Sequence, residues 1–280
     1  MIRTSVAILT ALVVLLCEVT YGQSWRTFAE YQASNGKERR DTLGLIGSHK
    51  VTPSSQSDLL LILSSAVSDS DVDIRLAGLK AIQGRAGAAR FVDQADVIER
   101  WRNERHTLLL LREPVLTALN DGDERVRKEA VVALGNLAYE LSGSRAEPIF
   151  DDMTLTQLFE RFSVESSALV REEIVKDAPS GGNSAIRARI IEKGLDDSDP
   201  GVLAFAARGA GKLQDLAALP KVVALLGHTD RNVRLQAALA LTAFGALAST
   251  YLPDVRGAAN READPIVKRT LESVAVALGK

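Results

Sequence analysis

The chain has 280 residues, of which 25% are charged and 46% hydrophobic, a composition that is typical of a globular protein and excludes wholesale disorder. Its 34 Lys and Arg against 36 Asp and Glu give a net charge of -2, which argues against a nucleic-acid binder. A single cysteine excludes a disulfide scaffold and a cysteine-based zinc site. Aromatic residues make up only 5% of a chain rich in Ala, Leu and Val, which favours close-packed helices over a β-sandwich.

The N-terminal residues have the layout of a signal peptide. Arg3 precedes an apolar run, residues 6–16, that is shorter than the ~20 residues of a bilayer-spanning helix. Thr20 and Gly22 fit a leader-peptidase cleavage site. We therefore predict a signal peptide at residues 1–22, an exported mature chain that is periplasmic or secreted, and no later membrane span. An uncleaved N-terminal anchor is the alternative.

One sequence pattern recurs along the rest of the chain. Its clearest copy, residues 121–135, is an acidic turn followed by Val-Arg-x-x-Ala-x-x-Ala-Leu-Gly. Most copies follow one another at roughly 31–36 residues, a period that predicts a repeat architecture. The first positions of the copies are residues 38, 74, 126, 170, 202, 233 and 267, and the copy at Glu38 is a weaker one.

Each copy has the same physical content. Apolar positions at 0, +4, +7 and +8 fall on one stripe of a helix, and small residues at +4 and +7 let a neighbouring helix approach closely. An Asp before the stripe is suited to cap the helix N-terminus. Because a lone hairpin cannot bury its apolar face, the units are expected to stack. A preceding helix is predicted from apolar runs at residues 59–63, 115–119, 190–195 and 219–226.

The pattern resembles HEAT repeats, especially the short HEAT-like variety, over roughly residues 25–279. The resemblance rests on the Asp before the second helix, on Val-Arg at 126/127 and 233/234, and on the Ala-x-x-Ala-Leu that follows. It implies an all-α fold: a right-handed α-solenoid of about six to seven stacked helical hairpins, in a single domain at residues 23–280. Two departures are visible, because Leu203 replaces the Arg of one copy and Pro179 interrupts another.

Longer spacings between copies predict insertions. The first lies at residues 84–108, within which residues 91–105 are expected to form an extra helix, and the second lies between residues 142 and 154. Residues 179–184 read Pro-Ser-Gly-Gly-Asn-Ser and predict a flexible joint. That joint is either a hinge or a tight turn between repeats.

The sequence shows no catalytic constellation. His49, His106 and His228 stand outside any metal-ligand motif, and we interpret them as surface or turn residues. The glycines of residues 207–212 lack the spacing of a phosphate loop. We interpret the recurrent arginines as partners of acidic groups in adjacent turns rather than as an anion-binding ladder. They are Arg75, Arg127, Arg171 and Arg234. We predict no metal, no cofactor and no enzymatic activity.

A protein-binding surface is predicted on the second helices. By resemblance to HEAT arrays, these helices line the concave face where ligands commonly bind, and positions +3 and +6 are the least buried. This ridge mixes charged and apolar residues, which suits a polypeptide better than a polyanion. A separate candidate, Trp101, lies in the first insertion among arginines, and either binds a partner or packs under the insertion. The ridge candidates are Lys80, Glu129, Lys176, Phe205 and Arg208, and Glu173 and Leu239 lie on the same ridge.

These inferences predict an exported, non-catalytic scaffold that binds a protein or peptide, with no nucleic-acid partner. Two alternatives stay open. One is a subunit or accessory factor of an envelope enzyme complex, and the other is a lyase-like accessory enzyme, because such enzymes share the HEAT architecture.

Overall fold

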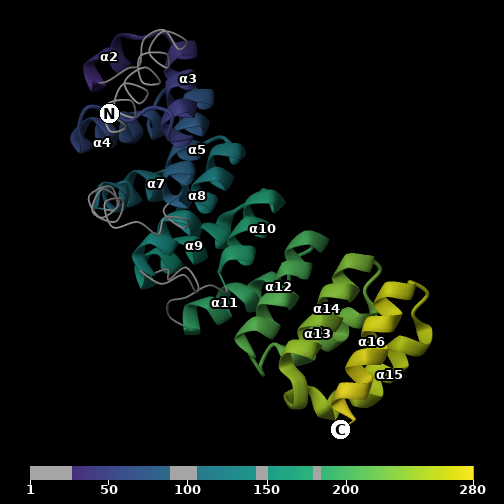
Figure 1. The fold of residues 1–280 in the computed structure, drawn as a ribbon. Helices are drawn as coiled ribbons and strands as arrows, with labels where there is room; N and C mark the ends of the chain where they lie inside the picture. Colours follow the sequence, from purple (N-terminus) through teal and green to yellow (C-terminus); the bar gives the residue numbers. More distant parts are fainter. Residues whose placement is uncertain (1–26, 89–105, 143–150, 179–183, 280) are drawn as a thin grey trace, which may run out of the picture. The chain divides into compact units, whose positions relative to one another are not determined.

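The computed structural model describes residues 27–88, 106–142, 151–178 and 184–279 (Figure 1). Within these ranges every regular element is a helix and no strand occurs, which confirms the predicted all-α fold. The chain forms two compact units, Met1–Pro114 and Val115–Lys280. Each unit is described by itself below.

The first unit contains two helical hairpins. α2 (Phe28–Ala33) and α3 (Gly36–Gly47) precede α4 (Gln56–Val67) and α5 (Val72–Ala88). α3 and α4 both pack against α5. A Cβ added at Gly47 of α3 would lie 2.8 Å from the Cα of Ala81 in α5, so a glycine is needed for this approach.

The second unit continues the same arrangement. α7 (Arg112–Ala118) spans the boundary between the units, and a first helix alternates with a second helix from there on. The remaining elements are α8 (Glu124–Ser142), α9 (Asp152–Val164), α10 (Ala168–Asp177), α11 (Ser184–Gly194), α12 (Pro200–Leu213), α13 (Leu219–Ala224) with the 3₁₀ turn η2 (Leu225–Gly227), α14 (Arg231–Phe244), the 3₁₀ segment η3 (Gly245–Tyr251), α15 (Leu252–Arg261) and α16 (Pro265–Leu278).

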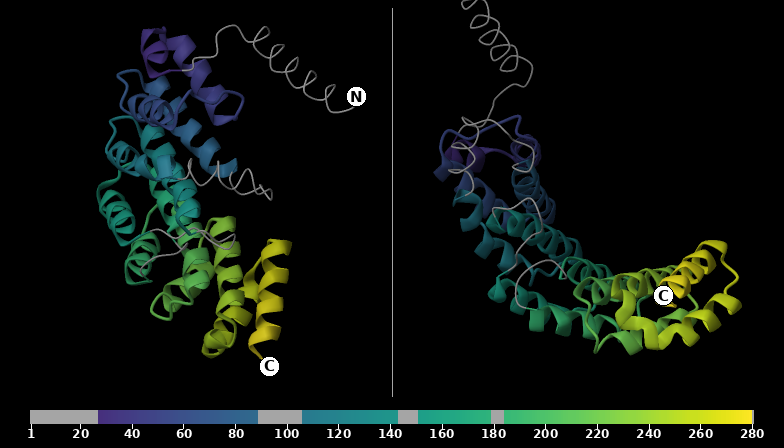
Figure 2. Two further views of the ribbon diagram at one scale, coloured as in Figure 1. Left: turned by 60° about the vertical axis from the view of Figure 1, so that its left-hand side comes forward. Right: turned by 60° about the horizontal axis from the view of Figure 1, so that its bottom comes forward.

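The second helices of this unit are α8, α10, α12, α14 and α16, and each packs against the next one in the row. The first helices lie in a neighbouring layer, where α11 contacts α12, α13 contacts α14, and α15 contacts α16. Figure 2 shows α12, α14 and α16 side by side in both views. The stacking of paired helices that the repeat pattern predicts is therefore confirmed.

Burial follows the predicted stripe. In the copies that begin at Val126, Val202 and Val233, positions 0, +4, +7 and +8 are all buried. Four positions of the other copies differ from the prediction, and two of them, Leu45 and Ala275, are only partly buried. Glu38 stands at position 0 of the first copy but is exposed, because it forms a capping box with Asn35. Asp177 stands at a +7 position and is only half-buried.

The acidic residues before the second helices cap them as expected. Asp199, Asp230 and Asp264 each accept hydrogen bonds from two backbone N–H groups in the first turn of the helix that follows. Pro at the first helical position of α12 and α16 fits this arrangement, because it lacks the N–H that would need a partner. Turn and helix start are thus fixed together by the local sequence.

One stretch departs from the expectation that no later segment is apolar enough to cross a membrane. Residues 231–261 pass that test by length and composition. The structure divides the stretch into α14, η3 and α15 at Gly245, where φ is +55°. α14 packs against α12 and α16, so its buried residues belong to the core of the stack.

Several predictions fall outside the described residues. The signal peptide at residues 1–22 does so entirely, as do the predicted extra helix and almost all of the joint at residues 179–184. These stay predictions. Within the two insertions, the structure describes helix at residues 84–88 and 106–108 and again from residue 152 onward.

Candidate binding site

Neighbouring second helices are joined by arginine side chains that bind both their own turn and the turn of the next repeat. We call each such arrangement an arginine clamp. Arg127 donates hydrogen bonds to the carbonyl oxygens of Asp121 and Gly122 in its own turn. Its other nitrogens donate to both carboxylate oxygens of Glu165, at 2.8 Å each, in the turn of the next repeat. The clamp therefore joins two repeats, which confirms the interpretation of the recurrent arginines as partners of adjacent turns.

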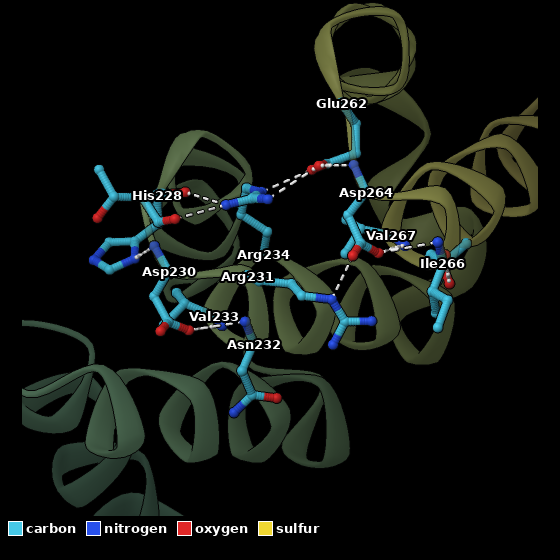
Figure 3. A network of polar contacts seen from close by, with 12 residues as sticks. His228, Asp230, Arg231, Asn232, Val233, Arg234, Glu262, Asp264, Ile266 and Val267 are labelled. Carbon is cyan, nitrogen blue, oxygen red and sulfur yellow. Dashed lines mark hydrogen bonds and ion pairs between the residues drawn. The ribbon is translucent and has the colours of Figure 1, made fainter.

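Arg171 and Arg234 make the same clamp. Arg171 binds the Asp197 carboxylate at 2.7 and 2.9 Å, and Arg234 binds the Glu262 carboxylate at 2.7 and 3.0 Å. Figure 3 shows the last of these clamps, in which Arg234 also holds the carbonyl oxygens of His228 and Thr229. Glu262 accepts a further hydrogen bond from the backbone N–H of Asp264, so one carboxylate fixes both the clamp and the next helix start.

Burial and hydrogen bonding act in opposite directions on these carboxylates. Burial of Glu165 would raise its pKa, but the hydrogen bonds from Arg127 and from the Ser167 backbone outweigh it and hold the pKa below its usual value. At Glu262 the hydrogen bond from Arg234 is the largest effect and lowers the pKa. Both groups are therefore charged at neutral pH and serve as structural partners rather than as proton carriers.

A pocket of about 200 Å³ opens between α10 and α12. We call it the α10–α12 pocket; it is lined by Lys176, Asp177, Phe205, Arg208, Gly209 and Lys212. Three of the predicted ridge residues thus come together in one place. Pockets for cofactors and drug-sized ligands are about 300–1,000 Å³, so this one is of a size to take a side chain.

The charges in the pocket differ in how they are satisfied. Lys176 forms an ion pair with Glu173 at 2.5 Å. Burial raises the pKa of Asp177 to about 6, with a further rise from the Glu173 charge, and Lys176 and Lys212 oppose the shift. Arg208 is exposed, and no hydrogen bond or ion pair joins it to another residue of the described chain. The pocket therefore presents a cation without an ion-pair partner in the described chain, beside the half-buried ring of Phe205.

The other predicted residues have separate positions. Lys80 is exposed on α5 in the first unit, Glu129 is half-buried on α8, and Trp101 lies outside the described residues. The prediction that Glu173 is among the least buried was wrong: it is buried, and it accepts a hydrogen bond from Lys176.

Sequence reasoning missed Asp177, Gly209 and Lys212 as pocket residues. Asp177 carried a signal, because a carboxylate stands where the neighbouring copies place Ala or Gly in the buried stripe. Lys212 lies one helical turn after Arg208, on the same face of α12. A search for charged residues at core positions would have found Asp177, and helical spacing from Arg208 would have found Lys212.

The histidines occupy turns or the surface, as interpreted from the sequence. His49 is exposed with φ of +58° and contacts Arg85, and the Nδ1 atom of His228 accepts a hydrogen bond from the Asp230 backbone. His106 is exposed. Among the described residues, no group of three or more His, Cys, Asp or Glu is placed to hold a metal ion.

Comparison with known proteins agrees with this architecture. Residues 188–275, which include α12, α14 and most of α16, match the sequence profile of HEAT repeats. This segment of the chain consists of HEAT repeats. The other described helices form similar hairpins, and Arg127 and Arg171 make the same clamp outside the matched residues, which extends the resemblance beyond them. No curated protein sequence matches the chain.

Solved structures of repeat proteins resemble this chain. The archaeal HEAT-like repeats protein from Thermococcus onnurineus NA1 has a TM-score of 0.55 at 15% identity, covering 88% of this chain and 97% of its own. A designed armadillo repeat protein in complex with the peptide (KR)4 has a TM-score of 0.50 at 21% identity, covering 78% and 98%. Human deoxyhypusine hydroxylase has a TM-score of 0.40 at 15% identity, covering 90% and 84%, too low to support an argument. The first two likenesses show the fold, an α-solenoid of repeats.

Proposed function

We propose that this protein is a non-catalytic scaffold that binds a polypeptide on the exposed face of its second helices. The observation that carries the proposal is the α10–α12 pocket, which sets an unsatisfied arginine beside an aromatic ring at the surface. Arg and aromatic side chains are the residue types that dominate protein-binding surfaces. The designed armadillo protein in complex with a peptide has a similar fold, which is consistent with this kind of partner.

The mixed chemistry of the face also supports a polypeptide ligand. Along α8, α10, α12 and α14 the +6 positions are Val132, Lys176, Arg208 and Leu239. Leu239 is 45% exposed on α14, the helix that packs against α12. A polyanion would require a continuous row of cations, whereas two charged positions flanked by apolar ones match the mixed side chains of a peptide.

A capture experiment tests the proposal. The full chain and the triple variant K176S/F205S/R208S are immobilised, and bound polypeptides from a native extract are compared by mass spectrometry. We expect specific polypeptides to be retained by the wild type and lost from the variant. A triple serine variant of exposed residues on α16, K268S/R269S/E272S, is the matched control and should retain them. Identical profiles for the wild type and the pocket variant would contradict the proposed surface.

We further propose that the chain is exported after removal of residues 1–22. The proposal is supported by the short apolar run behind Arg3 and by the small residues at 20 and 22. Intact-mass measurement of protein expressed with its full N-terminus should give a chain that starts at Gln23. A mass that retains residues 1–22 would favour the uncleaved anchor.

A further inference from the structure

The α10–α12 pocket lies on a row of second helices whose spacing matches an extended peptide. Packed helices lie about 8–10 Å apart, and an extended chain advances about 3.3 Å per residue. An extended peptide that crosses the row therefore moves from one second helix to the next in about three residues. Arg208 and Leu239 occupy the same register position on the neighbouring helices α12 and α14.

The charge balance of the pocket favours an acidic side chain. Lys176 is held by Glu173, and Asp177 faces Lys176 and Lys212. This leaves the exposed guanidinium of Arg208 as the group whose charge the described part of the chain does not balance. A guanidinium presents a planar fork that binds a carboxylate through two parallel hydrogen bonds.

On this basis, and assuming the proposed scaffold function, we infer that the α10–α12 pocket binds the carboxylate of an acidic side chain in an extended peptide, while an apolar side chain about three residues away packs on Leu239. Arg208 binds the carboxylate, and Phe205 forms the apolar wall beside it. The recognised element is an acidic residue and an apolar residue separated by two others. A basic residue at the acidic position is rejected, because it would face the guanidinium of Arg208, whose charge is not balanced within the described part of the chain.

A symmetric peptide tests this inference for either direction of the bound chain. The probe is the labelled nonapeptide Gly-Leu-Ser-Ser-Glu-Ser-Ser-Leu-Gly, which has a leucine three residues on either side of its glutamate. Its binding to the full chain is measured by fluorescence anisotropy, alongside versions with Gln or Lys in place of Glu. The Glu peptide should bind at least about tenfold more tightly than the Gln peptide, because charge-assisted hydrogen bonds are the strong ones.

Two variants separate the two subsites. R208A should remove the preference for Glu over Gln, so that the two peptides bind with equal affinity. L239S should weaken both peptides by the same factor. R269A removes an exposed arginine of α16, outside the pocket, and serves as the matched control that should behave as the wild type. All three positions are exposed, so loss of folding is not expected, and circular dichroism of each variant checks it.

Each result bears on the inference. Equal affinity for the Glu and Gln peptides, equal effects of R208A and R269A, or no binding of the Glu peptide up to about 1 mM would overturn it. Displacement of the Glu peptide by inorganic phosphate as effectively as by unlabelled peptide would also overturn it, because the site would then bind a free anion. The capture experiment tests the scaffold function separately. That function remains supported if the wild type retains polypeptides that the variant K176S/F205S/R208S does not, whatever the peptide results.

Discussion

Leu203 and His228 stand at the two positions where neighbouring repeats place an arginine and its carboxylate partner. Arg171 reaches Asp197 and Arg234 reaches Glu262, but the repeat between them has an apolar side chain and an imidazole instead. His228 keeps the carboxylate's second role, since its Nδ1 atom accepts the backbone N–H of Asp230. The two departures therefore fit each other and leave no buried charge without a partner.

A double-mutant cycle at these two positions tests the interpretation of the clamp. L203R alone should destabilise the chain, because Leu203 is buried with Ala204 and Val233 and the new charge would have no carboxylate to bind. H228E supplies that carboxylate. The unfolding free energies from urea titration should show a favourable coupling of about 1–3 kcal/mol in the double variant. Additive effects would mean that the clamp does not transfer between repeats.

The pair of Arg127 and Glu165 should be costly to break. Their side chains are 9% and 0% exposed, and Glu165 also forms an ion pair with Arg161 at 2.9 Å. E165Q would therefore leave two largely buried guanidinium groups without their counter-charge, at a cost of about 3–5 kcal/mol. The matched control is D196N, which breaks an exposed pair with Lys221 and should cost no more than about 1 kcal/mol. Similar losses for both variants in denaturant unfolding would contradict the role assigned to burial.

Close packing of α12 on α14 depends on Gly211. A Cβ at this position would lie 2.8 Å from the Cα of Ala240 and 2.9 Å from its carbonyl oxygen. G211A should therefore lower stability by about 1–3 kcal/mol, because backbone must shift to accept the methyl group. G44A, where a Cβ would meet nothing within 4 Å, should instead raise stability by up to about 1 kcal/mol through helix propensity. Thermal unfolding of both variants measures the contrast.

The raised pKa of Asp177 predicts that the difference in stability between wild type and D177N depends on pH. Its pKa is raised to about 6 in the folded chain from the usual 3.8, so the folded state binds more protons than the unfolded state between these values. Wild-type stability therefore falls as pH rises through this window, whereas Asn stays neutral. D177N should be more stable by about 1–3 kcal/mol near pH 7.5 and equal to the wild type near pH 4. If the stabilities of the two proteins change with pH in parallel, the pKa of Asp177 is not raised in the folded chain.

The sequence predicted the repeat architecture because each unit repeats the same local physics. A capping Asp such as Asp230, a small residue such as Ala237 and an apolar stripe each constrain one helix and its neighbour. The arginine clamp could also be predicted from the sequence, since Arg and acidic residues recur at fixed distances from the turn. These features depend on residues close in sequence or on an equivalent residue one repeat away.

The candidate site was predicted only in part. The expectation that positions +3 and +6 are the least buried identified Phe205, Lys176 and Arg208. It could not show that Glu173 is buried and pairs with Lys176. It also could not reveal that Asp177 leaves the apolar stripe to line a cavity, because both outcomes depend on the packing between α10 and α12. Which charges neutralise one another is a property of side-chain geometry that register alone does not specify.

Site-specific photo-crosslinking is the decisive test of polypeptide binding on the second helices. A photo-reactive phenylalanine analogue replaces Phe205 in the full chain, and a second chain has it in place of Met153, which is 43% exposed on the first helix α9. After irradiation in native extract, adducts are identified by mass spectrometry. We expect defined polypeptide adducts at position 205, lost when R208A is added, and none in common at position 153. Adducts that are the same at both positions, or that form only at position 153, would show that the second helices are not the binding surface.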